Sequence, residues 1–344
     1  MRSNQYRMYR TLQWESPDMT QYACDACANT QDNRTFSAHE MMFGTHDSFE
    51  YFECGRCHAL QIAVVPDNLG DYYPDNYYSF ASMELPKSGG LKRALKRVRL
   101  QHALGHTSLL GSALVGLNGR PDLPDSFAHV PLHQDSRILD VGGGGGELLH
   151  HLYHEGFGNL TGVDPFVEQD IVFDQGVTIY KKTLSEMQGK FDLILFNHSF
   201  EHMNNSPEVL RDVTPLLAEG GHVVLAMPVA HCYAWEHYGV SWVQLDAPRH
   251  LVIHTTKSVE LLAEQTGLKL VHNECISTTF QFLGSEIYAR DIPLIDPETG
   301  ENNSKARARS LFTTEELAAF ETQAVELNAS GKGDTGLFIL SHGK

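Results

Sequence analysis

Two pairs of cysteines are the first residues whose type and spacing could do chemistry. Each pair has the form Cys-x-x-Cys, in the matching segments YACDACANT and FECGRCHAL. A turn of this spacing directs two thiolates at one point, and two such turns complete the tetrahedral sulfur set that zinc favours. Four thiolates leave no open position for substrate, so we expect a structural zinc ion rather than a redox dithiol or a catalytic metal. The predicted zinc ligands are Cys24, Cys27, Cys54 and Cys57.

A run of five glycines is the second chemical feature, and it joins an apolar segment to a helical one in RILDVGGGGGELL. Glycine allows a sharp turn and lets the backbone approach a ligand closely. Asp140 precedes the loop, where its charge would repel a pyrophosphate and attract a sulfonium or an amino group. A dinucleotide fingerprint would also need glycine or alanine where Glu147 stands. The loop therefore favours S-adenosylmethionine over NAD, and its assigned cofactor residues are Asp140, Gly142, Gly144 and Gly146.

A second carboxylate, Asp164, ends the next strand-like segment, LTGVD, about 20 residues after the glycines. A carboxylate at this position accepts hydrogen bonds from both ribose hydroxyls of an adenosyl ligand. This feature is shared by proteins that bind NAD and proteins that bind S-adenosylmethionine, so it supports an adenosyl ligand without naming it. The alternative is a turn-forming Asp-Pro pair.

Candidate proton acceptors lie where two later strands are expected to end. The segment NHSFEHM follows one strand and contains Glu201 and His202, and the connection after the next strand contains His231 and His250. Because histidine titrates near neutrality, His202, His231 and His250 are candidate bases, with Glu201 beside the first of them. The alternative for Glu201 and His202 is that they cap the following helix or pack on the cofactor.

Acceptor contacts are expected from the same long connection. Asp246 and Arg249 can bind hydroxyls or phosphates, since arginine makes bidentate contacts with either. Tyr233 belongs to an aromatic group that could line a site for a sugar ring. The other members of this group are Trp235, Tyr238 and Trp242. The alternatives are a structural ion pair in a buried loop and aromatic packing under a lid.

Short apolar runs and helical patterns alternate from Ser136 onward, which predicts a parallel sheet covered by helices, an α/β fold. A helix is expected over residues 206–221, with Ser206 as its N-cap and Pro207 at its first position. A last strand reached late predicts an antiparallel hairpin at the sheet edge. The expected strands are residues 137–141, 160–164, 177–181, 191–197, 222–228, 268–276 and 335–342.

The pattern divides the chain into three parts. We expect a zinc-binding ribbon lobe over residues 1–75, a helical linker or lid over 76–135, and the main domain over 136–344 with an insertion at about 283–330. The second part carries a basic run within an amphipathic helix pattern, which predicts a solvated helix face or a contact with a diphosphate or an anionic lipid surface. The basic residues are Lys87, Lys92, Arg93, Lys96, Arg97 and Arg99.

The segments RILDVGGGGGELL, GVDP, FDLILFNHSFEHM and LLAEGGHVVLAMP resemble the successive motifs of class I S-adenosylmethionine-dependent methyltransferases. The resemblance implies a Rossmann-like seven-stranded methyltransferase sheet, with Asp140 and the glycines around the methionine part of the cofactor and Asp164 on its ribose. Asn197, in the third segment, joins the expected cofactor residues. The chain departs from the pattern at Gly143, where many relatives have cysteine or another residue.

A narrower resemblance rests on the cysteine pairs together with YPDNYYSF and WVQLDAPRHLVIHT, which look like a zinc-ribbon methyltransferase group of sugar and cell-surface polysaccharide biosynthesis. It implies a small-molecule acceptor, a sugar or nucleotide-linked sugar, in polysaccharide or secondary-metabolite biosynthesis. Two rival functions stay open. One is an RNA base methyltransferase whose zinc ribbon binds nucleic acid, and the other is a non-catalytic module that senses S-adenosylmethionine.

Charge and hydropathy restrict the partners. The net charge is −17, which disfavours a dedicated nucleic-acid binder because the averaged field repels polyanions. No segment approaches the roughly 18 consecutive apolar residues of a membrane span, and the first residues lack the apolar core of a signal peptide. We therefore expect a cytoplasmic enzyme without a membrane span, whose oligomeric state is open.

Overall fold

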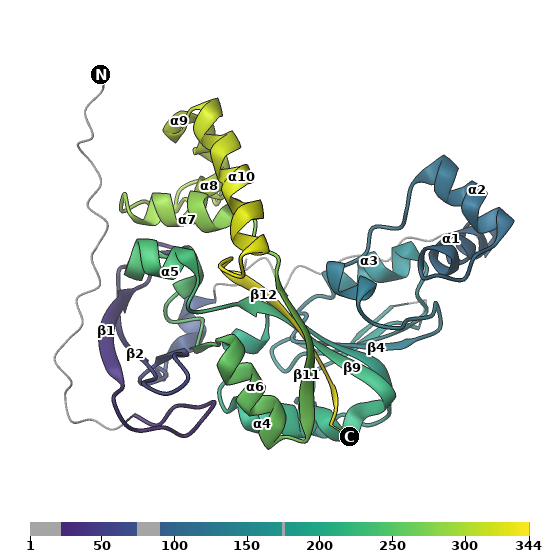
Figure 1. Cartoon of the computed structure of the whole chain (residues 1–344), viewed down its shortest axis with the longest axis horizontal. Helices are drawn as coiled ribbons and strands as arrows, with labels where there is room; N and C mark the ends of the chain where they lie inside the picture. Colours follow the sequence, from purple (N-terminus) through teal and green to yellow (C-terminus); the bar gives the residue numbers. More distant parts are fainter. Residues whose placement is uncertain (1–21, 74–89, 174–175, 344) are drawn as a thin grey trace.

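Two sheets organise the chain in the computed structural model, which describes residues 22–73, 90–173 and 176–343. The larger sheet crosses the centre of the molecule, the smaller one lies beside it with strands β1 and β2, and two groups of helices project from opposite sides (Figure 1). The helices are α1 (Gly90–Ala103), α2 (Leu109–Asn118), α3 (Glu147–Glu155), α4 (Ser206–Val213), α5 (Tyr233–Tyr238), α6 (Thr256–Gln265), α7 (Phe280–Tyr288), α8 (Asn303–Ala306), α9 (Ala308–Leu311) and α10 (Thr314–Ala329).

The larger sheet has the strand order β11-β12-β9-β8-β4-β5-β7-β6. Neighbouring strands from β9 to β7 are parallel, whereas β12 runs antiparallel to both β9 and β11. The strands are β4 (Arg137–Val141), β5 (Asn159–Val163), β6 (Ile171–Val172), β7 (Thr178–Tyr180), β8 (Phe191–Asn197), β9 (Leu217–Pro228), β11 (Leu268–Cys275) and β12 (Thr335–His342). The predicted α/β sheet with a late antiparallel pair at its edge is confirmed, and the short strand β6 adds an eighth member.

The central strands are buried on both faces, as their continuous apolar sequences require. In β8, Ile194 and Phe196 face a core layer that includes residues of α4 and α6, whereas Leu193 and Leu195 face a layer that includes residues of α3 and α1. Because successive side chains of a strand point to opposite faces, one apolar run serves both layers. The carboxyl ends of β4, β5 and β8 therefore lie along one edge of the sheet, where the loops that follow them can meet.

The smaller sheet joins the N-terminal lobe to the main domain. Its order is β1-β2-β3-β10, with β1 (Arg34–His39), β2 (Ser48–Glu53), β3 (Leu60–Ile62) and β10 (Val252–Ile253). Strand β10 belongs to the part of the chain that we assigned to the main domain, and it pairs antiparallel with β3. The two parts thus share one sheet, although the residues that form it are about two hundred positions apart.

The basic run of the linker is used largely for packing. Arg93 donates to the carbonyl oxygens of Tyr153 and Phe157, and its guanidinium lies 3.7 Å from the centre of the Tyr153 ring. Lys96 donates to the carbonyl oxygen of His154, and Arg97 and Arg99 pair with Asp135 and Glu155. Lys87 lies outside the described residues. These contacts attach α1 to α3 and leave the basic face mostly engaged by the protein itself.

The helix predicted over residues 206–221 begins at Ser206 as expected, but its predicted N-cap and its predicted end are wrong. Its N-cap is Asn205, at φ +59°, and the backbone N–H of Ser206 donates 2.7 Å to the Asp25 carboxylate of the N-terminal lobe. The helix ends at Val213 because β9 already begins at Leu217, which pairs with Phe191. The register of the β8–β9 pairing shifts after that pair, and Gly220 and Gly221, which we expected to end the helix, lie in this irregular part of β9.

The expected insertion takes the form of helices α7 to α10, which lie between β11 and β12 in the chain and stand above α5 in Figure 1. Their apolar side chains, among them Phe282 and Phe320, join a core cluster with α5 and the smaller sheet. Among the helices of the described residues, none is long and apolar enough to cross a membrane.

Candidate active site and metal centre

The glycine loop leaves β4 with three residues in the left-handed region. Gly142, Gly144 and Gly146 have φ values of +73°, +53° and +87°, which L side chains rarely adopt. Gly146 is the N-cap of α3. A Cβ atom at Gly143 would lie 2.1 Å from Oδ2 of Asp140, so this departure from the family pattern lets the loop close over the aspartate side chain.

Asp140 is the buried charge of this loop. Its side chain is 1% exposed, and neither carboxylate oxygen has a hydrogen-bond partner among the described residues. Burial, with a smaller contribution from Asp164, raises its pKa to about 7. A buried carboxylate without donors is costly unless a cationic or hydrogen-bonding partner is supplied from elsewhere. Asp140 therefore fits a cationic ligand at the loop.

Asp164 fixes the loop from the neighbouring strand. Its carboxylate accepts the N–H of Gly144 at 2.9 Å and that of Phe166 at 2.8 Å. These bonds tie the end of β5 to the glycine turn, and each oxygen retains a further lone pair. Asn197, the last residue of β8, is exposed at the same edge of the sheet.

The loop after β8 packs directly on the glycine loop. Ser199 donates to the carbonyl oxygen of Val141 at 2.6 Å, and a Cβ at Gly142 would lie 2.8 Å from Cβ of Ser199. Two residues later, Glu201 is 1% exposed, and its oxygens have no hydrogen bond within the described residues. The predicted cofactor loop and the predicted acid-base pair are thus neighbours through Ser199.

Three histidines surround Glu201. Nδ1 of His198 lies 3.5 Å from Oε1 of Glu201, and Nε2 of His250 lies 4.0 Å from the same oxygen. His202 is close as well, since its ring centre lies 4.8 Å from that of His250. Burial alone would raise the pKa of Glu201, but these three rings outweigh burial and lower it to about 2. The structure brings His202 and His250 together around this carboxylate.

The two predicted bases at this cluster are oriented by backbone carbonyls. Nδ1 of His202 donates to the carbonyl oxygen of Arg249 at 2.9 Å, and the hydroxyl of Tyr73 lies 3.2 Å from that nitrogen. Nδ1 of His250 donates to the carbonyl oxygen of Gln244 at 2.7 Å. Burial, with the nearby His202 ring, lowers the pKa of His250, so its ring is neutral with the lone pair on Nε2.

Arg249 belongs to a buried network rather than to an open surface. Its guanidinium is fully buried and donates to Asp246 at 2.6 Å and to Glu40 of the N-terminal lobe at 2.8 Å. Glu40 is also fully buried and accepts the N–H groups of Phe43 and Thr45. Arg249 and Asp246 thus form a buried ion pair, the arrangement that the sequence left as an alternative, and their role in acceptor binding stays a prediction.

His231 and Tyr233 lie apart from the Glu201 cluster in their contacts. His231 is half-exposed, and its Nε2 is 3.7 Å from Glu53, which also binds His58 and Arg34. Tyr233 begins α5 and stacks on His237. The other predicted aromatic wall is core packing, because Trp235, Tyr238 and Trp242 are all buried.

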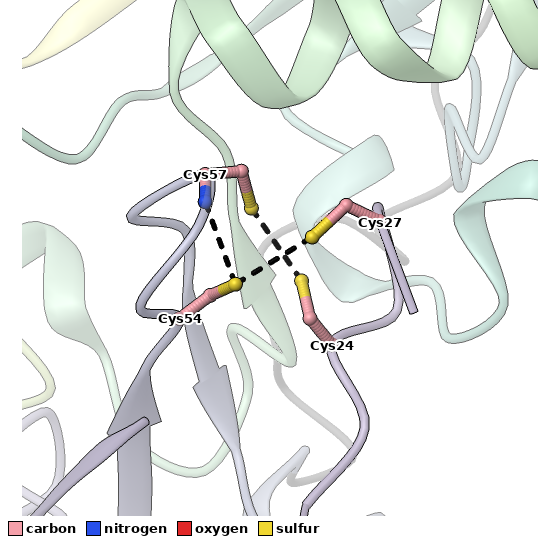
Figure 2. Close-up of side chains that lie close together, drawn as sticks. All are labelled: Cys24, Cys27, Cys54 and Cys57. Carbon is pink, nitrogen blue, oxygen red and sulfur yellow. Dashed lines mark hydrogen bonds between the residues drawn. The ribbon is translucent and has the colours of Figure 1, made fainter. Parts of the chain in front are cut away.

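The four paired cysteines converge in the N-terminal lobe, and Figure 2 shows their sulfur atoms directed at a common centre. The Sγ atoms of Cys24 and Cys57, and those of Cys27 and Cys54, are 3.5 Å apart. That separation is far longer than a disulfide bond of about 2.05 Å. It is close to the roughly 3.8 Å expected between thiolates that each lie about 2.3 Å from a tetrahedral zinc ion. The residues present therefore fit a zinc ion.

The cysteine turns are bonded to the main domain. Thr255 donates its hydroxyl to the carbonyl oxygen of Cys57 at 2.7 Å, and Gln265 donates to that of Ala26 at 3.0 Å. Both donors belong to α6 or its N-cap. The cysteine turns are thus held against both ends of α6.

Sequence comparison decides the enzyme class. Residues 120–273 match a family model described as a methyltransferase domain, and this range contains the glycine loop and the Glu201 cluster. The chain carries a methyltransferase domain. The prediction of an S-adenosylmethionine-dependent methyltransferase is confirmed by this match and the fold, whereas the roles of individual residues stay predictions. No curated protein sequence matches the chain.

Solved structures that resemble the methyltransferase domain are distant. The mitomycin 7-O-methyltransferase MmcR has 10% identity and a TM-score of 0.37, over 61% of this chain and 49% of its own, so the chain spans about half of that protein. Coclaurine N-methyltransferase, bound to N-methylheliamine and SAH, has 14% identity and a TM-score of 0.39, over 75% of this chain and 90% of its own. An S-adenosylmethionine-dependent methyltransferase from Mesorhizobium loti has 17% identity and a TM-score of 0.38, over 66% of this chain and 100% of its own. At these values they indicate nothing about the acceptor.

Sequence reasoning missed three residues that contact the candidate site or the segments around it. His198 is adjacent to the predicted Asn197, but only the turn after β8 brings it to Glu201. Glu40 gives no signal in the sequence, because its partner Arg249 is 209 positions away. Asp25 lies inside a Cys-x-x-Cys turn, where its spacing suggested no contact with α4.

Proposed function

We propose that the enzyme transfers the methyl group of S-adenosylmethionine to a hydroxyl of a small-molecule acceptor at the edge of the sheet formed by the ends of β4, β5 and β8. The cofactor is assigned to Asp140, Asp164, Asn197 and the glycine loop. The acceptor is assigned to the region in front of Glu201, His202 and His250. The observation that carries the proposal is the buried, unpartnered Asp140 carboxylate beside a left-handed glycine turn.

The residues of the loop fit the cofactor in charge and in space. Asp140 offers two unpaired oxygens to a cationic sulfonium or ammonium group. Asp164 fixes Gly144 while retaining lone pairs that can accept from ribose hydroxyls. A pyrophosphate would instead meet two buried carboxylates, which argues against NAD.

Methyl transfer requires few catalytic groups from the protein. When bound, S-adenosylmethionine supplies a sulfonium methyl that bonds to the acceptor oxygen as the sulfur–methyl bond breaks and its electron pair stays on sulfur. The chain has to hold the acceptor in line and allow the hydroxyl proton to leave. Glu201, His202 and His250 are the polar cluster nearest the glycine loop through Ser199, so we assign the acceptor hydroxyl to them.

Zinc is proposed for the four-cysteine centre. Its role would be to fold the N-terminal lobe, because all four thiolates are ligands and none remains for catalysis. The bonds from Thr255 and Gln265 to the cysteine turns support a second effect, which is to hold the segment with Arg249 and His250 in place.

A sugar, free or linked to a nucleotide, is the acceptor class that we favour from the sequence resemblance. RNA is the rival, and the acidic surroundings of the metal centre argue against it. Asp25, Asp32 and Glu53 lie in or beside the cysteine turns, and the net charge is −17. A lobe that binds nucleic acid should be basic.

The test is a transfer assay with labelled S-adenosylmethionine against nucleotide sugars, free sugars and RNA. We expect a methyl ether on a sugar acceptor, and we expect His250→Ala to lose turnover while its cofactor affinity stays near that of wild type. His272→Ala, on β11, is the matched control. Methylation of RNA alone, or of no acceptor despite tight cofactor binding, would contradict the proposal.

A further inference from the structure

A buried carboxylate without a hydrogen-bonded cation lies in the cluster formed by Glu201, His202 and His250. We infer that these three residues bind a divalent transition-metal ion that positions the acceptor hydroxyl for methyl transfer. One ligand atom from each residue lies within 4.8 Å of the others. The inference rests on the proposed function for its catalytic meaning, but the ion binding can be measured without turnover.

The carboxylate of Glu201 is the first reason for a cation. It is 1% exposed, and neither oxygen accepts a hydrogen bond from any described residue. Nδ1 of His198 is 3.5 Å from Oε1 of Glu201, which is too long for a good hydrogen bond. A buried carboxylate in this state is normally paired or coordinates a metal.

The orientation of the two histidines is the second reason. Each donates its Nδ1 proton to a backbone carbonyl, His202 to Arg249 and His250 to Gln244. The remaining nitrogen, Nε2, therefore carries a lone pair in the neutral ring. Metal-binding histidines make this hydrogen bond almost without exception, because it fixes the ring and its tautomer.

The third reason is the spacing of the possible ligand atoms. Nε2 of His250 lies 4.0 Å from Oε1 of Glu201 and 3.9 Å from Oδ2 of Asp246. Ligands about 2.1 Å from one ion lie roughly 3.0 to 4.2 Å apart. The His250–Glu201 separation falls in that range, so an ion could bridge these atoms with small shifts. Two imidazoles and one carboxylate suit Mn²⁺, Fe²⁺ or Zn²⁺.

Two other clusters of similar composition lack this combination. His129, His272 and Glu274 are partly exposed, and their carboxylate already contacts both rings, at 3.0 and 3.4 Å. Glu53 contacts His58 and His231 but also pairs with Arg34, which supplies the positive charge. The Glu201 cluster combines a buried carboxylate that accepts no hydrogen bond with two imidazoles whose Nδ1 atoms donate to backbone carbonyls.

A bound ion would change the role of both histidines from proton acceptors to ligands. Held by Glu201, His202 and His250, such an ion would act as a Lewis acid and lower the pKa of the acceptor hydroxyl, so that its proton would leave to water as its oxygen attacks the methyl group. The oxygen–methyl bond then forms, the sulfur–methyl bond breaks, and the sulfonium becomes a neutral thioether. No oxidant or further reactant is needed.

The experiment is a calorimetric titration of the full chain, its cysteine site filled with zinc, with Mn²⁺, together with the Mn²⁺ spin-resonance signal. Mn²⁺ is the probe because thiolates favour zinc and leave Mn²⁺ for oxygen and nitrogen ligands. We expect one bound ion per chain and a loss of affinity of at least roughly 100-fold in Glu201→Gln and His250→Ala. His272→Ala should bind Mn²⁺ as wild type does.

S-adenosylmethionine affinity, measured on every variant, separates the possible failures. A variant that binds the cofactor normally is folded, so its loss of Mn²⁺ reports on the ligand set. Mn²⁺ binding that survives Glu201→Gln, or that disappears in His272→Ala, would overturn the inference. So would cofactor binding and turnover without any Mn²⁺ binding, since a proton would then balance Glu201. Absence of cofactor binding would instead overturn the proposed function.

Discussion

Asp140 carries a charge that the folded protein leaves without compensation. Its carboxylate is buried against the glycine loop, and burial raises its pKa to about 7, with Asp164 adding to the effect. In the ligand-free protein the group is therefore largely protonated below pH 7 and charged above it. A cationic ligand favours the charged form, so cofactor binding and deprotonation of Asp140 should be coupled.

The first prediction is that cofactor affinity rises with pH through this pKa. Below pH 7, binding must expel a proton, so the affinity should fall by up to about tenfold per pH unit and level off above pH 7. The measurement is the ratio of wild-type to Asp140→Asn affinity for S-adenosylmethionine between pH 5.5 and 8.5. The ratio cancels the titration of the ligand itself. A constant ratio would contradict the coupling.

Single residues differed in how well the sequence placed them. Asp140, Asp164 and the glycines follow strand ends directly, so local pattern sufficed to put them at one edge of the sheet. Arg249 looked equally suited to an acceptor, but its buried partner Glu40 comes from the other lobe. Sequence spacing carries no information about such a contact.

At the scale of elements, the segment before β10 links the two lobes to the site. The side chain of Arg249 pairs with Glu40, and the carbonyl oxygen of Arg249 accepts a hydrogen bond from Nδ1 of His202. The next residue, His250, accepts the hydroxyl proton of Tyr51 at its own carbonyl. A change in the N-terminal lobe can therefore reach the Glu201 cluster through Arg249 and His250.

The second prediction concerns Glu40→Gln, which removes the lobe's half of the buried ion pair. Breaking such a pair typically costs about 3–5 kcal/mol, and since Asp246 still neutralises Arg249 we expect the lower end, about 3 kcal/mol. Urea unfolding gives the free energy, and Glu260→Gln on the exposed face of α6 is the control. A change within about 0.5 kcal/mol, as expected of a surface substitution, would show that Glu40 contributes no structural charge.

Element types were more predictable than element ends. The strands of the main domain came from continuous apolar runs, and all seven are present. The helix after β8 ended early because Leu217 pairs with Phe191, a contact that local propensity does not contain. Strand β10 has two residues, too few for a periodic signal, and exists because β3 offers it a partner.

At the scale of the whole molecule, the four-cysteine cluster and the methyltransferase domain form one packed unit. The cysteines lie in the same apolar cluster as the residues of α4 and α6 beneath the large sheet. Asp25 binds the start of α4, and Cys57 binds the N-cap of α6. The three-part division read from the sequence thus describes the order of the chain better than it describes its packing.

The third prediction is that loss of the proposed zinc loosens residues 249–255 as well as the N-terminal lobe. Hydrogen exchange after Cys57→Ser, or after removal of zinc by a chelator, should speed up at both places, while β4 and β8 stay protected. Cys275→Ser, outside the four-cysteine cluster, is the control. Unchanged exchange at residues 249–255 would mean that the lobe is folded independently of the site.

The most direct test of the account is calorimetric titration of the zinc-replete protein with S-adenosylmethionine, S-adenosylhomocysteine and NADH, repeated with Asp164→Asn. Binding of the two adenosyl-sulfur ligands at one site, with no binding of NADH, is the predicted result. The substitution should weaken the binding of both by at least about tenfold, because it disturbs the carboxylate that holds Gly144 and that we assign to the ribose. Binding of NADH alone, or of none of the three, would contradict the assignment of the glycine loop.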